Sequence, residues 1–552
     1  MLNTRLGCLL LLGVILLGCT VQAQVPTFTI KNQLVNPVSN LLFGQMMERA
    51  APGEPGPEAA LIPGTHDLQS EALRLLNNMQ FPLIRFPGGG VVESQDWTTL
   101  IDNAPGRPAT RATGFLFGYD EYLRLAEQLK CETILPVNLR DGIWKSTTLD
   151  AAALQAAGLV AYCNAPLGAK LPAGMPDWPA IRAKNGHPAP YHVNYFQVGN
   201  DIFAYYSPQT MDKIAHIQDP EEQLQWCLTS IRKYIEVMRQ VDPSIKIIVD
   251  GVSWSPENFK VVERILADSY IKAHADFVSH HLYLPHNTRT VQKNGVDVAM
   301  TDLTSEELWN AGVSTPFMDK DGQAVLQGNP LPGRNIPELA EKYHWKIAMT
   351  EWNWNGWANN DTANSLFMKG IGVAGFLHAI IRDGGQIDLA TQSMLIGKAW
   401  DFDSIHVDPT GKEPAYPHPC GQMTAFYAKY HGNKNLFVEA QHIPTYVQPI
   451  RLTEIGPKEK VAVLDAIATA SDNKLYFHVI NRDFTKDHQV VITLADFPVA
   501  GHVIQHCFEG TLKNEPPKLA WITDTTLAVK DNTISVTLPM RSVSILEIDL
   551  AK

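Results

Sequence analysis

The sequence predicts an α/β protein: a (β/α)8 barrel of the TIM type joined to a C-terminal antiparallel β-sandwich. Two patterns predict this architecture. From about residue 38 to 400, short apolar runs alternate with segments of helical periodicity, which is typical of βαβ units around a parallel sheet. After about residue 435, short alternating runs are separated by turn signals, which is typical of a sandwich.

Eight apolar runs are the expected barrel strands, and eight βαβ units close a barrel. In chain order they read LLFGQMME (41–48), PLIRFPGG (82–89), TILPVNL (133–139), YFQVGND (195–201), KIIVDG (246–251), FVSHHLY (277–283), KIAMTEW (346–352) and LATQSML (389–395). Amphipathic stretches at 67–79, 119–130 and 221–241 are expected helices between them. The proline- and glycine-rich stretch 51–64 is an expected loop over the barrel mouth.

The sandwich is expected to combine residues 24–37 with residues 431–552. Strands are predicted at 474–483, 488–494, 502–510, 533–539 and 542–550, and the opening run 27–35 is expected to pair back onto them. The barrel domain is then expected over 38–430.

Composition excludes one class of partner. The chain has 552 residues and a net charge of −12 with acids and bases interspersed, so it has no basic stripe to neutralise phosphates. Nucleic acid is therefore not an expected partner.

The first residues have the layout of a secretory signal: one positive charge, an apolar run from Leu6 to Leu17, then small residues. The run is too short to span a bilayer. Two processing sites stay open. Cleavage after Ala23 makes residues 1–23 a signal peptide, whereas a lipobox ending at Cys19 makes residues 1–18 a lipoprotein signal and leaves a lipid anchor on Cys19. A secreted or periplasmic protein is expected, with a bacterial outer-membrane lipoprotein as the second alternative.

The remaining cysteines are Cys131, Cys163, Cys227, Cys420 and Cys507. They are scattered and lack paired metal-ligand spacing, so neither a disulfide framework nor a zinc site is indicated. No set of histidines and carboxylates has the spacing of a dedicated metal site, so no metal and no cofactor are expected.

Polar residues end the otherwise apolar barrel strands. The active site of such a barrel lies at the C-terminal ends of the strands, and a carboxylate there needs a partner or a substrate. The residues in this position are Glu48, Arg85, Asn200, Asp201, His281, Tyr283 and Glu351. Glycoside hydrolysis uses two carboxyl groups across the scissile bond, and Asp201 and Glu351 leave strands that face each other. Trp352, Trp354 and Trp357 follow Glu351; one indole is expected to stack on a sugar, with Trp352 as the candidate, and two to pack the rim.

Several motifs resemble the family 51 α-L-arabinofuranosidases. The most specific is RAKNGHPAPYHVNYFQVGND (182–201). Further family motifs, in the same order along the chain, are similar to LLFGQMMERA (41–50), LIRFPGGGVVESQDW (83–97), AYCN (161–164), VSHHLY (278–283) and MTEWNW (349–354). The end of the family's sandwich is similar to PMRSVSILEIDL (539–550).

The resemblance implies roles for single residues. Glu351 matches the family's nucleophile, Asn200 the neighbour that holds the sugar 2-hydroxyl, and Asp201 stands where the family has its acid/base glutamate. Glu48, Arg85, His281 and Tyr283 match substrate-pocket and nucleophile-supporting positions. Gly90 departs from the Asn or Cys that usually follows PGG, which removes a polar side chain from the pocket floor.

The aspartate leaves two alternatives. Asp201 is the proton donor, since aspartic acid meets the pKa requirement but places its carboxyl group one methylene shorter. Otherwise Asp201 is a remnant, and the protein binds sugar without turnover or borrows another acid, Glu93 or Asp96. Both of these acids are more simply interpreted as loop or capping residues.

The resemblance thus implies a retaining exo-glycoside hydrolase acting on furanosides, most simply an α-L-arabinofuranosidase on a plant or microbial polysaccharide or oligosaccharide. The N-terminal pattern adds that the enzyme is expected to be secreted. The alternatives are a galactofuranosidase, an endo-β-glucanase or xylanase on the same scaffold, and a catalytically degenerate glycan-binding protein. A homo-oligomer is left open.

Overall fold

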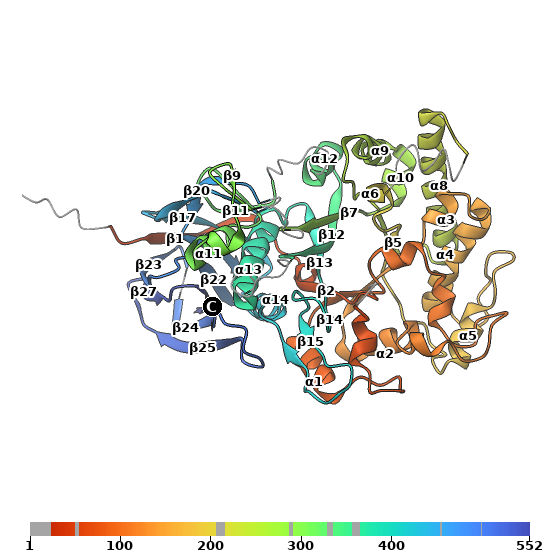
Figure 1. Cartoon of the computed structure of the whole chain (residues 1–552), viewed down its shortest axis with the longest axis horizontal. Coiled ribbons are helices and arrows are strands. Elements are labelled where there is room, and N and C mark those ends of the chain that lie inside the picture. Colours follow the sequence, from red (N-terminus) through yellow and green to blue (C-terminus); the bar gives the residue numbers. More distant parts are fainter. Residues whose placement is uncertain are drawn as a thin grey trace, which may run out of the picture.

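The computed structural model describes residues 24–49, 54–205, 216–285, 291–327, 335–355, 365–452, 455–497 and 499–551. The expected signal segment 1–23 lies outside them. Figure 1 shows two bodies, a sheet domain at one end and a barrel at the other. The expected fold class, a (β/α)8 barrel with a β-sandwich domain, is confirmed.

The barrel closes from eight strands, one from each of the eight predicted runs, and every neighbouring pair is parallel. The strands are β2 (Gly44–Met46), β3 (Leu83–Arg85), β4 (Glu132–Val137), β5 (Tyr195–Val198), β6 (Lys246–Val249), β7 (Phe277–Tyr283), β12 (Lys346–Asn353) and β13 (Ile387–Ser393). Inside the barrel Leu83, Ile134, Ile248, Ala348 and Leu389 form a small apolar layer. Because the strands are buried on both faces, they read as nearly continuous apolar runs.

Helices connect successive strands. The main ones are α1 (Ser70–Met79), α2 (Tyr119–Leu129), α4 (Leu149–Asn164), α8 (Pro220–Val241), α9 (Pro256–Ala267), α12 (Ile336–Tyr343), α13 (Leu366–Arg382) and α14 (Pro419–Lys429). Side-chain caps begin several of them: Thr148 accepts from Ala151 N at α4, and Asp219 accepts from Glu222 N at α8. The helices predicted at 67–79, 119–130 and 221–241 are α1, α2 and α8. No helix among the described residues is long and apolar enough to cross a membrane.

The second domain is a ten-stranded sheet. Its order is β25 (Ala520–Leu527), β24 (Val499–Gly510), β28 (Ser542–Leu550), β22 (Lys474–Asn481), β21 (Leu464–Ala470), β17 (Lys434–Gln441), β1 (Thr27–Pro37), β23 (His488–Ala495), β27 (Thr533–Leu538) and β26 (Val529–Lys530). The opening strand β1 pairs antiparallel with β17 and parallel with β23. Alternating apolar residues of these strands form a separate core.

Helix α13 joins the two domains. It is buried along nearly its whole length, because one side packs on the barrel and the other meets β21, β22 and β28 of the sheet domain. A buried ionic cluster lies in this interface: Asp465 of β21 pairs with Arg482, 2.8 Å away, and with Arg382 at the end of α13. His378 of α13 lies 3.1 Å from the same carboxylate.

Candidate active site

Glu351 is the centre of a buried polar cluster at the C-terminal ends of the barrel strands. Arg85 Nη1 donates to Glu351 Oε1 at 2.9 Å, and the Tyr283 hydroxyl donates to Oε2 at 2.9 Å. Arg85 is fully buried and also donates to Gln197 and Asn200. One charged donor and one hydroxyl donor therefore fix the position of the Glu351 carboxylate, as a nucleophile needs.

Asp201 forms an ion pair with His281. The Nδ1 atom of His281 lies 2.8 Å from Asp201 Oδ1 and 3.6 Å from Glu351 Oε2, while its Nε2 contacts the Thr350 hydroxyl at 2.9 Å. Burial alone would raise the pKa of Asp201, but His281, with Arg85, outweighs it and lowers that pKa. Burial likewise opposes protonation of His281, yet Glu351 and Asp201 raise the pKa of the imidazole. One proton therefore resides on the pair, on the histidine side.

Glu48 faces the same cluster, and its pKa shifts upward, whereas that of Asp201 shifts downward. Burial and the charge of Glu351 raise the pKa of Glu48 to about 8, although Arg85 opposes the shift. A carboxylic acid with this pKa carries its proton at neutral pH. Beside Glu351 the cluster thus contains a carboxylate–imidazolium pair, Asp201 with His281, and a protonated acid, Glu48.

The two expected catalytic carboxylates are close together. One carboxylate oxygen of Asp201, one of Glu351 and one ring nitrogen of His281 all lie within 4.8 Å of one another. Carboxyl groups of retaining glycosidases lie about 5–5.5 Å apart, and those of inverting enzymes about 6.5–9.5 Å apart, because inversion needs room for water. The spacing fits retention.

Two buried acids, Glu93 and Asp250, hold the backbone around Asp201. This residue has φ of 54°, a left-handed conformation that Asp tolerates better than most residues. Glu93 Oε1 accepts from Asn200 N at 2.7 Å, and Asp250 Oδ2 accepts from Ile202 N at 2.7 Å. Carboxylates thus bind the backbone N–H groups of both neighbours of Asp201, Asn200 and Ile202.

The contacts of Glu93 give it a role other than that of a substitute proton donor. Its other oxygen accepts from the backbone amides of Leu139 and Arg140 at 3.0 and 2.7 Å, so both oxygens are occupied by peptide N–H groups. Asp96 caps a 3-10 helix at Thr98 and pairs with Arg107. Neither acid points a free carboxyl group at Glu351. No signal in the sequence separated Glu93 from an ordinary loop acid.

The specific RAKNGHP motif supports strand β5 from outside. Arg182 is fully buried and donates to the carbonyl oxygens of Tyr162, His187 and Pro188. Asn185 donates to Tyr162 and to the Asp102 carbonyl. These bonds hold the chain segment that leads into β5, which carries Asn200 and Asp201 at its end.

The PGG segment makes room for Glu48. Gly89 has φ of 56°, and a Cβ atom there would lie 1.6 Å from Glu48 Oε1. A Cβ atom at Gly90 would meet nothing within 4 Å. Gly90, the residue after PGG, therefore borders open space. Because glycine stands here in place of the family's usual Asn or Cys, no side chain fills that space.

Trp352 is not brought to the cluster. Its side chain is fully buried and stacks on Phe376 of α13, on the helix-facing side of β12 opposite to Glu351. Side chains alternate along a strand, so a residue next to Glu351 points away from it. Trp354 is also buried and donates to the Gly312 carbonyl. The structure therefore gives Trp352 a packing role in place of the expected sugar contact. Trp357 lies outside the described residues.

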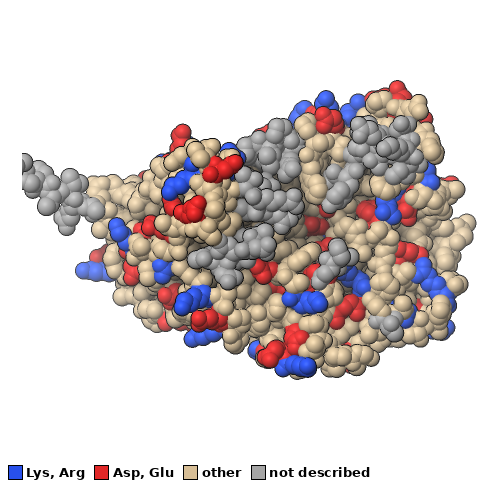
Figure 2. Space-filling view, in the orientation of Figure 1, with Lys and Arg blue, Asp and Glu red and all other residues tan. Residues whose placement is uncertain are grey.

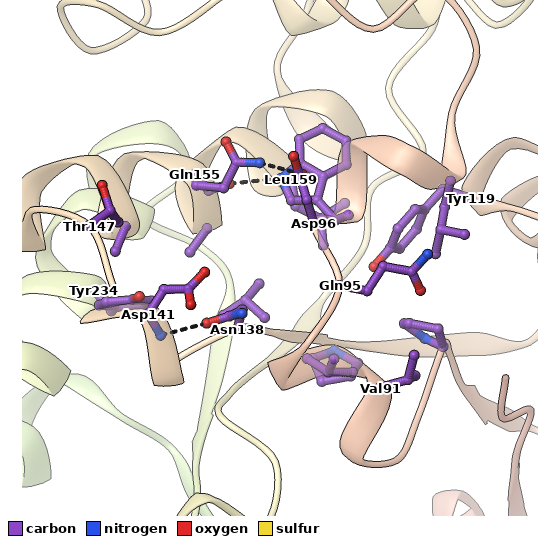
Figure 3. A pocket seen from close by; sticks show the side chains of 18 of the residues that line it. Val91, Gln95, Asp96, Tyr119, Asn138, Asp141, Thr147, Gln155, Leu159 and Tyr234 are labelled. Atoms are coloured by element: carbon purple, nitrogen blue, oxygen red, sulfur yellow. Dashed lines mark hydrogen bonds between the residues drawn. The ribbon is translucent and has the colours of Figure 1, made fainter. Parts of the chain in front are cut away.

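A separate cavity of about 310 Å³ lies beside the barrel, between the segment 91–97, the end of β4, and helices α4 and α8. Figure 3 shows Asn138 and Asp141 joined by a hydrogen bond on one wall, and Asp96 and Gln155 on another. None of the carboxylate cluster lines it.

Known proteins resemble the chain in sequence. A family model described as "Alpha-L-arabinofuranosidase 1 domain" matches residues 75–297, which include Arg85, Asn200, Asp201, His281 and Tyr283. α-L-Arabinofuranosidase C of Emericella nidulans is 27% identical over 272 residues, 46% of this chain and 48% of the relative. Intracellular exo-α-(1→5)-L-arabinofuranosidase 1 of Bacillus subtilis is 27% identical over 39% of this chain and 38% of the relative. The matches span at most about half the length of these relatives.

Solved structures resemble the chain over nearly its whole length. The α-L-arabinofuranosidase of Thermotoga maritima in complex with arabinose aligns with a TM-score of 0.68 at 20% identity, covering 95% of this chain and all of that one. The family 51 enzyme of Thermotoga petrophila aligns with a TM-score of 0.67 at 20% identity, covering 95% and 99%. A bifunctional glucanase-xylanase from a metagenome library has a TM-score of 0.54 at 14% identity, covering 96% and 99%. At these identities the structures establish the fold. The resemblance inferred from the motifs is confirmed: in the sequence of its barrel and in its fold, the chain is like the glycoside hydrolases of family 51, the α-L-arabinofuranosidases.

Proposed function

We propose that the protein is a retaining exo-α-L-arabinofuranosidase in which Glu351 is the nucleophile and Asp201 the acid/base residue. The observation that carries the proposal is the contact of both carboxylates with one imidazole, with oxygens of Asp201 and Glu351 within 4.8 Å of each other. This spacing fits double displacement through a covalent intermediate.

The reaction follows from the contacts. Glu351, held by Arg85 and Tyr283, attacks the anomeric carbon while the glycosidic C–O bond breaks and the leaving oxygen takes a proton. A water molecule then gives a proton back to the acid/base group and displaces Glu351 from the sugar. Tyr283 serves as a neutral donor throughout, because burial raises its pKa well above the ordinary value.

The proton comes from the Asp201–His281 pair. His281 holds it in the free site, and transfer through Asp201 places it on the leaving oxygen. Glu48 is a second candidate donor, since burial and Glu351 raise its pKa to about 8. A group protonated at neutral pH beside the nucleophile is what a general acid requires.

Leaving-group dependence tests the proposal. An activated 4-nitrophenyl α-L-arabinofuranoside needs little protonation, whereas an arabino-oligosaccharide needs full protonation. We expect Asp201→Asn to lower kcat/KM on the oligosaccharide by about 10²–10⁴-fold and on the activated substrate far less. Glu351→Gln is expected to abolish turnover of both. Parallel assays of Glu48→Gln identify the donor, since only the true donor shows the selective loss.

The same assays separate the alternatives. Activated galactofuranosides, glucosides and xylosides, together with polymeric β-glucan and xylan, test the galactofuranosidase and endo-acting hypotheses. A native protein that turns over none of them, but gains activity as Asp201→Glu, contradicts the proposal and favours a degenerate glycan-binding site. Methanolysis followed by NMR reports the configuration; an inverted methyl glycoside contradicts the retaining mechanism.

We also propose that the protein is exported, either as a secreted protein or as a lipoprotein anchored through Cys19. The apolar run from Leu6 to Leu17 and the lipobox ending at Cys19 support export. Mass spectrometry of the mature N-terminus distinguishes the two: a diacylated Cys19, lost in Cys19→Ala, supports the lipoprotein, and an unmodified Gln24 start supports cleavage after Ala23. An unprocessed Met1 contradicts both.

A further inference from the structure

We propose a zinc-type divalent metal site formed by Asp403, His406 and His418, outside the carboxylate cluster. One ligand atom from each of the three residues lies within 4.8 Å of the other two. Two imidazoles and one carboxylate, with a fourth position for water, are a ligand set that suits Zn²⁺ and related ions better than Ca²⁺ or Mg²⁺, which prefer oxygen ligands.

Among the described residues, the carboxylate of Asp403 forms ion pairs with two imidazoles, those of His406 and His418, and with no lysine or arginine. The side chain is fully buried, and among the described residues neither carboxylate oxygen has an aligned hydrogen bond. The Nδ1 atom of His406 has none either. The three groups only approach one another: His418 Nδ1 lies 2.6 Å from Oδ1 and His406 Nδ1 lies 3.4 Å from Oδ2. Buried carboxylates are normally hydrogen-bonded, paired in good geometry or bound to a metal.

The backbone holds the three residues in place without help from the metal. A small sheet of β14 (Ile396–Gly397), β15 (Ile405–His406) and β16 (Tyr416–Pro417) sets the register of His406 opposite Gly397 and Tyr416. His418 N donates to the Ser404 carbonyl at 3.0 Å. Ligands of a tetrahedral zinc ion lie about 3.3 Å apart, so the 3.4 Å Asp403–His406 contact already fits, and the 2.6 Å Asp403–His418 contact must lengthen on binding.

The surroundings are acidic. A Cβ atom on Gly397 would lie 2.7 Å from Asp403 Oδ2 and 3.0 Å from Glu54 Oε2, so two carboxylates converge over this glycine. Glu54 is saturated by backbone amides of residues 56 and 398–400, and Asp401 lies close to the buried Lys369. The carboxylates of Asp403, Glu54 and Asp401 outnumber the single Lys369, and this excess of negative charge favours a cation here. Glu54 is not one of the proposed ligands, because backbone amides already occupy its oxygens.

The site joins a segment that contacts the strand of the candidate nucleophile. Asn353, two residues after Glu351, donates to the carbonyl oxygen of Phe402 at 3.0 Å. A metal on Asp403 and His418 would tie this segment to the start of α14. The fold brings together residues whose separations of three and twelve positions do not match a known metal-binding motif, so the sequence alone indicated no metal site.

Zinc titration of the chelator-treated full-length protein tests the proposal. We expect one equivalent of Zn²⁺ to bind by calorimetry and to raise the melting temperature. His406→Gln and His418→Gln should each weaken binding at least tenfold. His488→Gln is the matched control, because His488 pairs with Asp483 at 3.0 Å, away from the cluster. It should bind like the native protein.

The cluster of Asp201, His281 and Glu351 is the competing location for an ion. Glu351→Gln should therefore retain binding. X-ray absorption of the zinc-loaded native protein gives a readout that needs no variant: two imidazole ligands support the proposal, whereas the competing cluster offers one. The proposal is overturned by absence of zinc binding, by one imidazole ligand, or by binding that survives both histidine changes.

Discussion

At the scale of single residues, the identity of the proton donor depends on how the charges around His281 are coupled. This histidine lowers the pKa of Asp201 and also lowers that of Glu48, while its own pKa is raised by Glu351 and Asp201. The acid limb and the alkaline limb of kcat/KM report essential groups of the free enzyme. The two donor hypotheses therefore predict opposite shifts of the alkaline limb of kcat/KM when His281 is removed.

His281→Gln is expected to move the alkaline limb of kcat/KM to lower pH. In the native protein the pair loses its proton only when His281, with its raised pKa, deprotonates. In the variant, Asp201 alone must hold the proton, with a pKa that burial raises from an aspartate value of about 3.9. If Glu48 is the donor, its pKa rises without His281, and the limb moves to higher pH instead. His280→Gln is the control, because burial lowers the pKa of His280 to about 3 and it is neutral throughout.

At the scale of elements, the turn after β3 determines where Glu48 can lie. Gly89→Ala places a Cβ atom 1.6 Å from Glu48 Oε1 at a position with φ of 56°. The backbone conformation costs about 1–2 kcal/mol, which a folded barrel tolerates, but Glu48 must move. We expect kcat/KM to fall about 10²-fold with the fold retained by circular dichroism, because catalytic groups act only when correctly placed.

Gly90→Ala is the matched control for this prediction. The two glycines are adjacent and receive the same methyl group, but at Gly90 nothing lies within 4 Å. Its activity should stay within about twofold of the native value. Equal losses in both variants, or no loss in Gly89→Ala, would contradict the assignment of Glu48 to the site.

The same elements explain what the sequence could predict. All eight barrel strands, and the cluster around Glu351, could be found from apolar runs that end in polar residues. The strands are apolar because both of their faces are buried, and polar residues follow them because the active site of such a barrel lies at the C-terminal ends of its strands. Strands β17, β21 and β25 were not among the predicted runs. The role of Glu93 depends on amide groups far away in sequence. The packing of Trp352 on Phe376 follows from the alternation of side chains along a strand, and the expected sugar stacking did not take that alternation into account.

At the scale of the whole molecule, both charge distribution and domain contact affect stability. Figure 2 shows acidic and basic side chains interspersed over the visible face, in keeping with the surface expected from composition. The strongest charge interactions are inside. Asp465 is fully buried between the domains and contacts Arg382, Arg482 and His378. Burial would raise the pKa of Asp465, but the two arginines hold it well below its usual range.

Asp465→Asn is expected to lower the free energy of unfolding by about 3–5 kcal/mol at pH 7, because it leaves the fully buried Arg482 without its carboxylate. A carboxyl group with a depressed folded-state pKa stabilises fully above its unfolded pKa, and this stabilisation is lost as pH falls through the folded value. The difference between native protein and variant should therefore stay constant above about pH 5 and shrink in more acidic solution. Urea unfolding followed by tryptophan fluorescence across this range measures it.

Asp472→Asn makes the same chemical change at the surface, where Asp472 is 94% exposed and pairs with Lys434 at 3.2 Å. Solvent screening reduces such a pair to about 0–1 kcal/mol, so this variant should unfold nearly like the native protein. Equal destabilisation by the two substitutions would show that the cluster around Asp465 does not hold the domains together. A large loss confined to Asp465→Asn, with the pH dependence above, would place much of the interdomain stability in one carboxylate.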